Sequence, residues 1–166
     1  MNNMKIKKLV LSGLFAAIIC VTTMFPHLPV GVNGGYVHIG DTFIYLAASL
    51  LSPAYAVAAS AIGSGLADLF VAPIYILPTV IIKSFMALMF TAKGSKLLCK
   101  HNVLAIVFAG IICTVGYYIA EVVLAGNFIS PLLSTLQGLI QPLASGIIYV
   151  IIASVIDKKK GFLSST

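Results

Sequence analysis

The sequence predicts an all-α integral membrane protein, a compact bundle of six transmembrane helices. Hydrophobic residues occupy 60% of the 166 positions and charged residues only 8%, whereas roughly a quarter of the residues in a soluble domain are charged. Long apolar runs follow one another along the chain, and short lysine clusters separate some of them. A water-soluble fold of this size could not bury so much apolar surface, so the chain is expected to lie in a bilayer.

The composition also excludes several classes of protein. The formal charge of +6 comes from lysines, because the chain has no arginine, and nucleic-acid-binding surfaces usually contain arginine. Nucleic acid is therefore not expected as a partner. The three cysteines are isolated in the sequence, which predicts no metal site and no disulfide framework. No cofactor is expected either.

The first apolar run covers residues 9–25 and follows three lysines. As a helix it would be about 26 Å long, just enough for the ~30 Å hydrocarbon layer. No small-x-small cleavage site follows it, and Phe25-Pro26 ends the run instead. We therefore expect an uncleaved first span rather than a signal peptide.

A polar, glycine-rich stretch, residues 33–41, lies between the first and second apolar runs. Its three glycines free the backbone to adopt positive φ and to let another group approach closely. We expect a flexible loop at one membrane face that closes over a small-molecule site. Asp41 or Thr42 is a natural N-cap for the helix that follows.

Residues 42–71 are mostly apolar and too long for one straight span, but Ser52-Pro53 interrupts them. Serine is favoured at a helix cap and proline at the first helical position. We interpret this dipeptide as a tight turn between a short second span and a third span. The alternative is a single tilted helix with a proline kink.

The lysine clusters decide between these alternatives, because cytoplasmic segments are enriched in lysine. The clusters lie at residues 5–8, 93–100 and 158–160. With the turn, even numbers of spans separate them, so that all three clusters and both termini are cytoplasmic. Without it, two of the three would lie outside. The prediction is a single membrane domain, 1–166, with spans 9–25, 42–51, 53–70, 77–92, 103–125 and 131–156 and outer loops 26–41, 71–76 and 126–130.

Ionisable side chains within a span cost about 3 kcal/mol on insertion scales and mark function by default. Here Asp68, Lys83 and Glu121 fall in the outer halves of their predicted spans. Gln137 and Gln141 are four residues apart and would share a face of the sixth helix. Pro142 should kink that helix and free the carbonyl of residue 138.

Structural roles are the alternative for each of these groups. Asp68 and Lys83 could pair across a helix hairpin, and Asp41 could serve only as a cap. Convergence favours a binding site, because acidic, basic and amide groups from several segments fall at one depth beneath the glycine-rich loop.

Small residues four positions apart form a second pattern, since such faces let helices approach closely. In the first span they are Ser12 and Ala16, and Gly13 and Ala17. These residues either pack internally or face another membrane subunit. A similar set around Gly63 in the third span is expected to pack internally.

Several motifs resemble a known family. The stretch Gly-Tyr-Val-His-Ile-Gly-Asp at 35–41, together with segments 48–53, 61–68 and 78–83, resembles the substrate-binding S component of energy-coupling factor (ECF) vitamin transporters. These segments are similar to the members thought to take up hydroxymethylpyrimidine or pyridoxine-like compounds.

The resemblance implies a subunit in the bacterial cytoplasmic membrane that binds a vitamin or vitamin precursor at its outer end. An ECF transmembrane coupling subunit and two cytoplasmic ATPases would power its release inside. Ser12, Gly13, Ala16 and Ala17 are the nearest equivalents of the first-span motif that meets the coupling subunit. The sequence contains no ATP-binding glycine loop, so ATP hydrolysis is expected only in the partners.

The ligand is expected to be a small heterocycle, stacked on tyrosines and held by amide and charged groups. Candidate substrate-binding residues are Asn33, Gly35, Tyr36, His38, Asp41, Asp68, Tyr75, Lys83, Glu121, Asn127, Gln137 and Gln141.

The rival hypothesis is a stand-alone proton-coupled transporter that uses Asp68 and Glu121 as protonation sites. Its uptake would follow a pH gradient and would need no ATPase. An enzyme is not expected, because no catalytic pairing or metal-ligand motif occurs at plausible spacing, and no residue is assigned a catalytic role.

Overall fold

The computed structural model describes residues 3–25, 27–30 and 35–164, and most of these residues are helical. The long helices are α1 (Asn3–Met24), α3 (Pro53–Val71), α5 (Lys100–Ala125) and α7 (Ile140–Ser164). The shorter elements are α2 (Asp41–Leu50), the 3-10 turn η1 (Pro73–Tyr75), α4 (Ile76–Leu88), α6 (Ser130–Gly138) and the strands β1 (His27–Val30) and β2 (Gly35–His38).

The apolar helices make this an integral membrane protein. Within the described residues, four helical segments are long and apolar enough to cross a bilayer: Asn3–Met24, Pro53–Val71, Lys100–Ala125 and Ser130–Lys159. Two shorter apolar helices, Asp41–Leu50 and Pro73–Leu88, occupy the places of the second and fourth predicted spans.

The turn at Ser52-Pro53 is confirmed. Leu51 and Ser52 both have extended backbone conformations, which separates α2 from α3, and Pro53 occupies the first turn of α3. The prediction that the fifth helix ends at Gly126 is also confirmed.

The sixth predicted span, residues 131–156, lies within the helical segment Ser130–Lys159, and the kink predicted from Pro142 is a break between two helices. α6 ends at Gly138 and α7 begins at Ile140. Pro142 has no backbone N–H for the carbonyl of Gly138, and its ring crowds that carbonyl. The break therefore occurs one turn before the proline.

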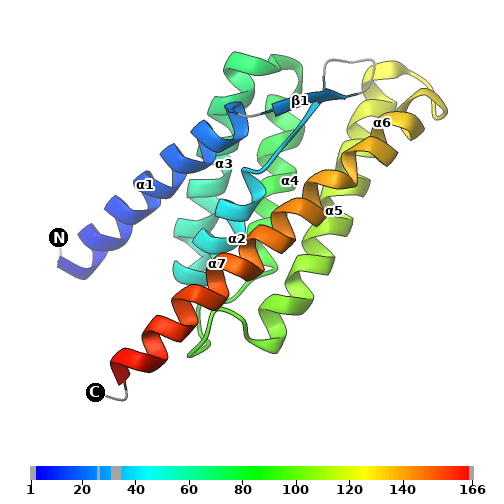
Figure 1. Ribbon diagram of the computed structural model, residues 1–166. Helices are drawn as coiled ribbons and strands as arrows, with labels where there is room; N and C mark the ends of the chain where they lie inside the picture. Colours follow the sequence, from blue (N-terminus) through cyan, green and yellow to red (C-terminus); the bar gives the residue numbers. More distant parts are fainter. Residues whose placement is uncertain (1–2, 26, 31–34, 165–166) are drawn as a thin grey trace.

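The fold is mostly helical, but part of the loop predicted over residues 26–41 is a short sheet, which the prediction missed. β1 and β2 form an antiparallel hairpin in which His27 lies opposite His38 and Val30 opposite Gly35 (Figure 1). Valine and tyrosine in these short segments favour extended backbone. The flexible loop is therefore partly an ordered two-stranded sheet.

After the hairpin, the chain enters the middle of the bundle, where α2 is surrounded by longer helices (Figure 1). α2 has 10 residues, about 15 Å of helix or half the hydrocarbon thickness. Nearly all of its side chains are buried, from Asp41 to Ser49. The polar first turn of this helix therefore lies inside the protein rather than at its surface.

The two ends of the bundle differ. The start of α1 and the end of α7 point to one end, which we name the termini end, and the hairpin and α6 lie at the other, the hairpin end (Figure 1). At the termini end, buried Asn102 accepts a hydrogen bond from the Thr91 backbone at 2.8 Å. The Asp157 carboxylate accepts bonds from the backbone N–H groups of Leu97 and Leu98 at 2.8 and 2.9 Å. These contacts hold the connection between α4 and α5.

The small residues of α1 divide between two faces. Ser12 and Ala16 are buried against α3, where the Ser12 hydroxyl donates to the Tyr55 carbonyl at 2.8 Å. A Cβ added to Gly63 would lie 2.5 Å from the Ala16 carbonyl oxygen. Ser12 and Ala16 therefore pack internally, and their prediction as partner-facing residues is wrong.

The other pair, Gly13 and Ala17, lies on the exposed face of α1. A Cβ at Gly13 would meet no atom within 4 Å.

Matched glycine substitutions test this packing. We expect Gly63→Ala to lower the free energy of unfolding by on the order of 1–3 kcal/mol, because the new methyl group overlaps α1 backbone. Gly13→Ala, with open space around it, should cause no loss. Thermal unfolding in detergent measures both, and equal stability of the two variants would contradict the close α1–α3 contact.

Candidate substrate-binding site

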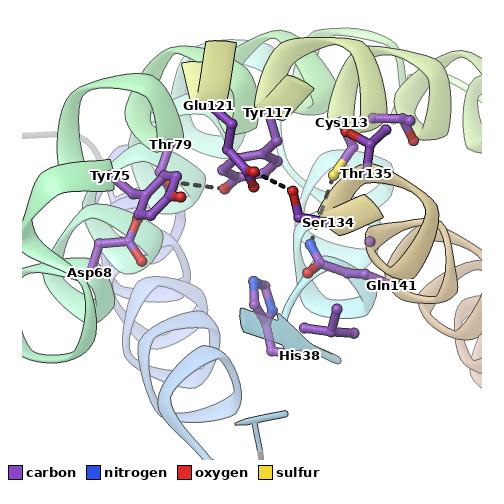
Figure 2. Close-up of a pocket in the computed structure, with 13 residues that line it drawn as sticks. His38, Asp68, Tyr75, Thr79, Cys113, Tyr117, Glu121, Ser134, Thr135 and Gln141 are labelled. Carbon is purple, nitrogen blue, oxygen red and sulfur yellow. Dashed lines mark hydrogen bonds between the residues drawn. The ribbon is translucent and has the colours of Figure 1, made fainter. Parts of the chain in front are cut away.

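A partly open cavity lies among the helices at the hairpin end. Side chains from β2, α3, η1, α4, α5, α6 and α7 surround it (Figure 2). Elements far apart in the sequence thus contribute to one site.

Five of the candidate residues predicted from the sequence line this cavity. They come from five separate elements, and each is at least nine-tenths buried. They are His38, Asp68, Tyr75, Glu121 and Gln141.

Two further candidates, Asp41 and Lys83, form a buried ion pair next to the cavity. Lys83 Nζ lies 2.6 Å from Asp41 Oδ1, and both side chains are 0% exposed. The partner of Lys83 is therefore Asp41 and not Asp68, the residue named in the structural alternative. The predicted capping role is wrong as well, because Gly40 is the N-cap of α2, while Asp41 is its first residue and turns its carboxylate to Lys83.

Gln141 completes this cluster. Its Nε2 donates to Asp41 Oδ2 at 2.7 Å. A carboxylate that already binds an ammonium group accepts hydrogen bonds, so the Gln141 amide must present its NH₂ group to Asp41 and its carbonyl oxygen elsewhere. The Sγ atom of Cys113 lies 3.8 Å from Asp41 Oδ2 and from Lys83 Nζ. The buried charge is thereby neutralised, and the Gln141 carbonyl remains as an acceptor beside the cavity.

His38 is oriented by the backbone of the next turn. The Gly40 N–H donates to His38 Nδ1 at 3.0 Å, so the proton of the neutral ring is on Nε2. Gly40 is required here for space, since a Cβ would lie 2.2 Å from Thr23 Oγ1 and 2.9 Å from His38 Nδ1. The His38 ring lines the cavity in this orientation (Figure 2).

Two tyrosines form an aromatic wall. Tyr75 and Tyr117 meet edge to face, with ring centroids 6.3 Å apart. The hydroxyls of Tyr117 and Thr79 share a 2.8 Å hydrogen bond, and Lys83 Nζ lies 5.2 Å from the Tyr117 ring centroid. The Tyr75 hydroxyl is buried and has no hydrogen-bond partner within the described part of the chain.

A hydrogen bond connects Glu121 on α5 to α6. Its Oε2 accepts a hydrogen bond from the Ser134 hydroxyl, which also lies 3.0 Å from the Pro131 carbonyl (Figure 2). This contact joins the short helix α6 to the long helix α5 at the cavity.

Other candidates lie elsewhere. Asn127 is exposed, and its side chain closes the turn between α5 and α6 by accepting from Ser130 N at 2.8 Å. Gln137 is exposed on α6, because the break after Gly138 removes the shared face predicted for Gln137 and Gln141. These two placements contradict the prediction for Asn127 and Gln137.

The glycine-rich stretch contributes further candidates to the hairpin. Gly35 and Tyr36 belong to β2, where their backbones lie opposite Val30 and Pro29. Asn33 lies outside the described residues.

Several residues of the wall were not predicted from the sequence. A hydroxyl or thiol side chain in an apolar run does not by itself indicate a binding site, because such residues occur in membrane helices of every function. The additional polar lining residues are Thr79, Cys113, Thr114, Tyr117, Ser134 and Thr135, and Val37 and Gly138 complete the lining. Within the described ranges, no group of three or more His, Cys, Asp or Glu side chains could hold a metal ion.

Comparison with known proteins identifies the family of this chain. Residues 3–158 match the family model described as ECF-type riboflavin transporter, S component. The chain belongs to this family. It is also 29% identical over 141 residues to an uncharacterised protein of Pyrococcus woesei, an alignment that covers 80% of this chain and 93% of the relative.

The S component is a membrane-embedded, substrate-binding subunit of an ECF transporter. The family works with ATPase and transmembrane T subunits and binds a small vitamin. It is a family of transport components and not of enzymes.

Breaking the ion pair is expected to destabilise the S component. In Lys83→Met, the Asp41 carboxylate remains buried without its cation, which costs about 3–5 kcal/mol in buried pairs. The double variant Asp41→Asn/Lys83→Met should recover much of this loss, because neither charge remains. Thermal unfolding in detergent measures the effect.

The matched control for this substitution is Lys96→Met, at an exposed lysine of the termini end. The role assigned to the pair would be contradicted if Lys83→Met were as stable as this control. It would also be contradicted if the double variant were less stable than Lys83→Met.

Proposed function

We propose that this S component binds a small heterocyclic vitamin or vitamin precursor, such as hydroxymethylpyrimidine or pyridoxine, in the cavity at the hairpin end. The observation that carries the proposal is the gathering of His38, Glu121 and Gln141 from three elements around one space. These side chains are polar, buried and directed to the same partly open space, which is the arrangement typical of a ligand pocket with a few placed polar groups.

The side chains have separate roles in this proposal. Tyr75 and Tyr117 stack on the ring, while Asp68, Glu121, the Gln141 carbonyl and His38 Nε2–H bind its polar edge. Asp41 and Lys83 act from behind the cavity wall by holding Gln141. Gly35 and Tyr36 belong to β2, the strand whose His38 lines the cavity.

Riboflavin is the competing ligand, because the matching family model is named for it. We prefer a smaller heterocycle because segments 35–41, 48–53, 61–68 and 78–83 resemble the hydroxymethylpyrimidine and pyridoxine type.

An ECF transmembrane coupling subunit and two cytoplasmic ATPases energise uptake in this proposal. The exposed Gly13 and Ala17 face of α1 meets the coupling subunit, since a surface without large side chains lets another helix approach closely. Lipid surrounds the remaining apolar faces. The protein lies in the bacterial cytoplasmic membrane.

Six crossings with both termini in the cytoplasm complete the proposal. The lysine-bearing segments 5–8, 93–100 and 158–160 lie at the termini end (Figure 1), as expected for a cytoplasmic face. The hairpin end, with the cavity, then faces outward.

Site-directed labelling tests this orientation. In a variant without the native cysteines, Leu28→Cys on β1 should react with a membrane-impermeant maleimide in intact cells, because Leu28 is 68% exposed at the hairpin end. Lys96→Cys should react only after the membrane is permeabilised. The reverse pattern would contradict the proposed topology.

Transport measurements test the function. Cells without their own uptake of pyridoxine or hydroxymethylpyrimidine should accumulate the labelled compound when they produce the S component with an active ECF module. With an ATPase variant that cannot hydrolyse ATP, accumulation should fall to background. Accumulation that persists without the module and collapses with the pH gradient would instead support the proton-coupled transporter.

A further inference from the structure

An apolar groove lies between α5 and α7, and we call it the α5–α7 groove. The two helices approach closely at a glycine, because a Cβ added to Gly146 would lie 2.8 Å from Ile106 Cγ2. Apart from Thr114, which also lines the substrate cavity, the side chains along the groove are apolar. Val107 and Ile147 on its two sides are 57% and 63% exposed. The groove is therefore open to the surrounding lipid.

The groove continues to the termini end. Val107 also borders a second hollow, whose other lining residues are Leu98, Lys100, Val103 and Leu104. Lys100 is the first residue of α5. The helix rises about 17 Å from Lys100 to Ile111, close to the depth of one lipid leaflet, which is half of the ~30 Å hydrocarbon layer. The apolar path thus has the length of an acyl chain that starts at Lys100.

Lysines gather at this end of the groove. Lys100 lines it directly. The Leu97 N–H donates to the Asp157 carboxylate at 2.8 Å, which brings the preceding Lys96 and the following Lys158 toward one another. All three lysine side chains are exposed. The mouth of the groove is therefore surrounded by cationic groups.

Little negative charge balances these lysines. The chain has four acidic residues, and three of them, Asp41, Asp68 and Glu121, line the substrate cavity or lie next to it. The fourth, Asp157, binds backbone N–H groups. The first turn of α5 contains no acidic residue, and the N-terminus of a helix favours anions. An anionic group at the mouth of the groove would therefore be attracted.

We propose that the α5–α7 groove binds one anionic phospholipid, with its phosphate at Lys100 and one acyl chain along the two helices. Basic pockets between membrane helices bind anionic headgroups in this way. A helix from another subunit is the alternative occupant, but an apolar helix would leave the lysines without a counter-charge. The lipid site is separate from the substrate cavity and does not depend on which substrate is bound there.

Lipid binding to the purified, full-length protein tests the proposal by native mass spectrometry. Phosphatidylglycerol and phosphatidylcholine with identical acyl chains are titrated in detergent. We expect phosphatidylglycerol to bind at least about tenfold more tightly, because its net charge is negative. Lys100→Gln should weaken phosphatidylglycerol binding about fivefold. The control Lys7→Gln removes an exposed lysine of α1 that does not line the groove, and it should change nothing.

A second pair of variants tests the position of the acyl chain. Val107→Trp fills the groove and should weaken phosphatidylglycerol binding by at least about fivefold, because the chain loses its apolar contacts. The control Val123→Trp lies on the same helix, is 76% exposed in the wild type and does not line the groove. It should bind as the wild type does. Thermal unfolding checks that each variant is folded.

Three outcomes would overturn the proposal. The first is equal affinity for the two lipids. The second is a loss of phosphatidylglycerol binding that is as large in the controls as in Lys100→Gln and Val107→Trp, or absent from all four. The third is a folded Val107→Trp protein that keeps its lipid binding but no longer co-purifies with the coupling subunit, which would assign the groove to a protein partner. None of these outcomes bears on substrate binding, so the proposed function is tested separately.

Discussion

The buried ion pair between Asp41 and Lys83 is the constraint on which the site depends. A short helix that starts in the middle of the bundle places an acidic residue where water cannot reach it. An isolated carboxylate is very costly there, and a pair is tolerated only with good geometry and further hydrogen bonds. Lys83 and Gln141 supply both. The pair joins α2, α4 and α7 and sets the orientation of the Gln141 amide at the cavity.

Much of the architecture could be predicted because membranes restrict the choices. Apolar composition, helix length and lysine placement each follow from the thickness and sidedness of a bilayer. The rise per residue then places polar side chains at a given depth. For this reason Asp68, Glu121 and Gln141 could be expected near one another before their neighbours were known, and the structure brings them to one cavity.

Other features depend on interactions that spacing does not specify. Depth alone cannot say which way a side chain faces, so the sequence suggested Asp68 as a partner for Lys83, whereas the structure pairs Lys83 with Asp41. The break before Pro142 separates Gln137 from Gln141, and this requires knowing that α6 turns as a separate helix. Tyr117 and Ser134 become part of the site only through Thr79 and Glu121, partners on other helices.

The two ends of the bundle use buried polar groups differently. At the termini end, Asn102 and Asp157 bind backbone groups of the neighbouring connection, so their hydrogen-bonding capacity is used within the protein. At the hairpin end, the Tyr75 hydroxyl is buried without a partner in the described chain, and the Gln141 carbonyl faces away from Asp41. An unsatisfied buried group costs about 1–3 kcal/mol. In the proposed function, a bound molecule that hydrogen-bonds the Tyr75 hydroxyl recovers that free energy at the cavity wall.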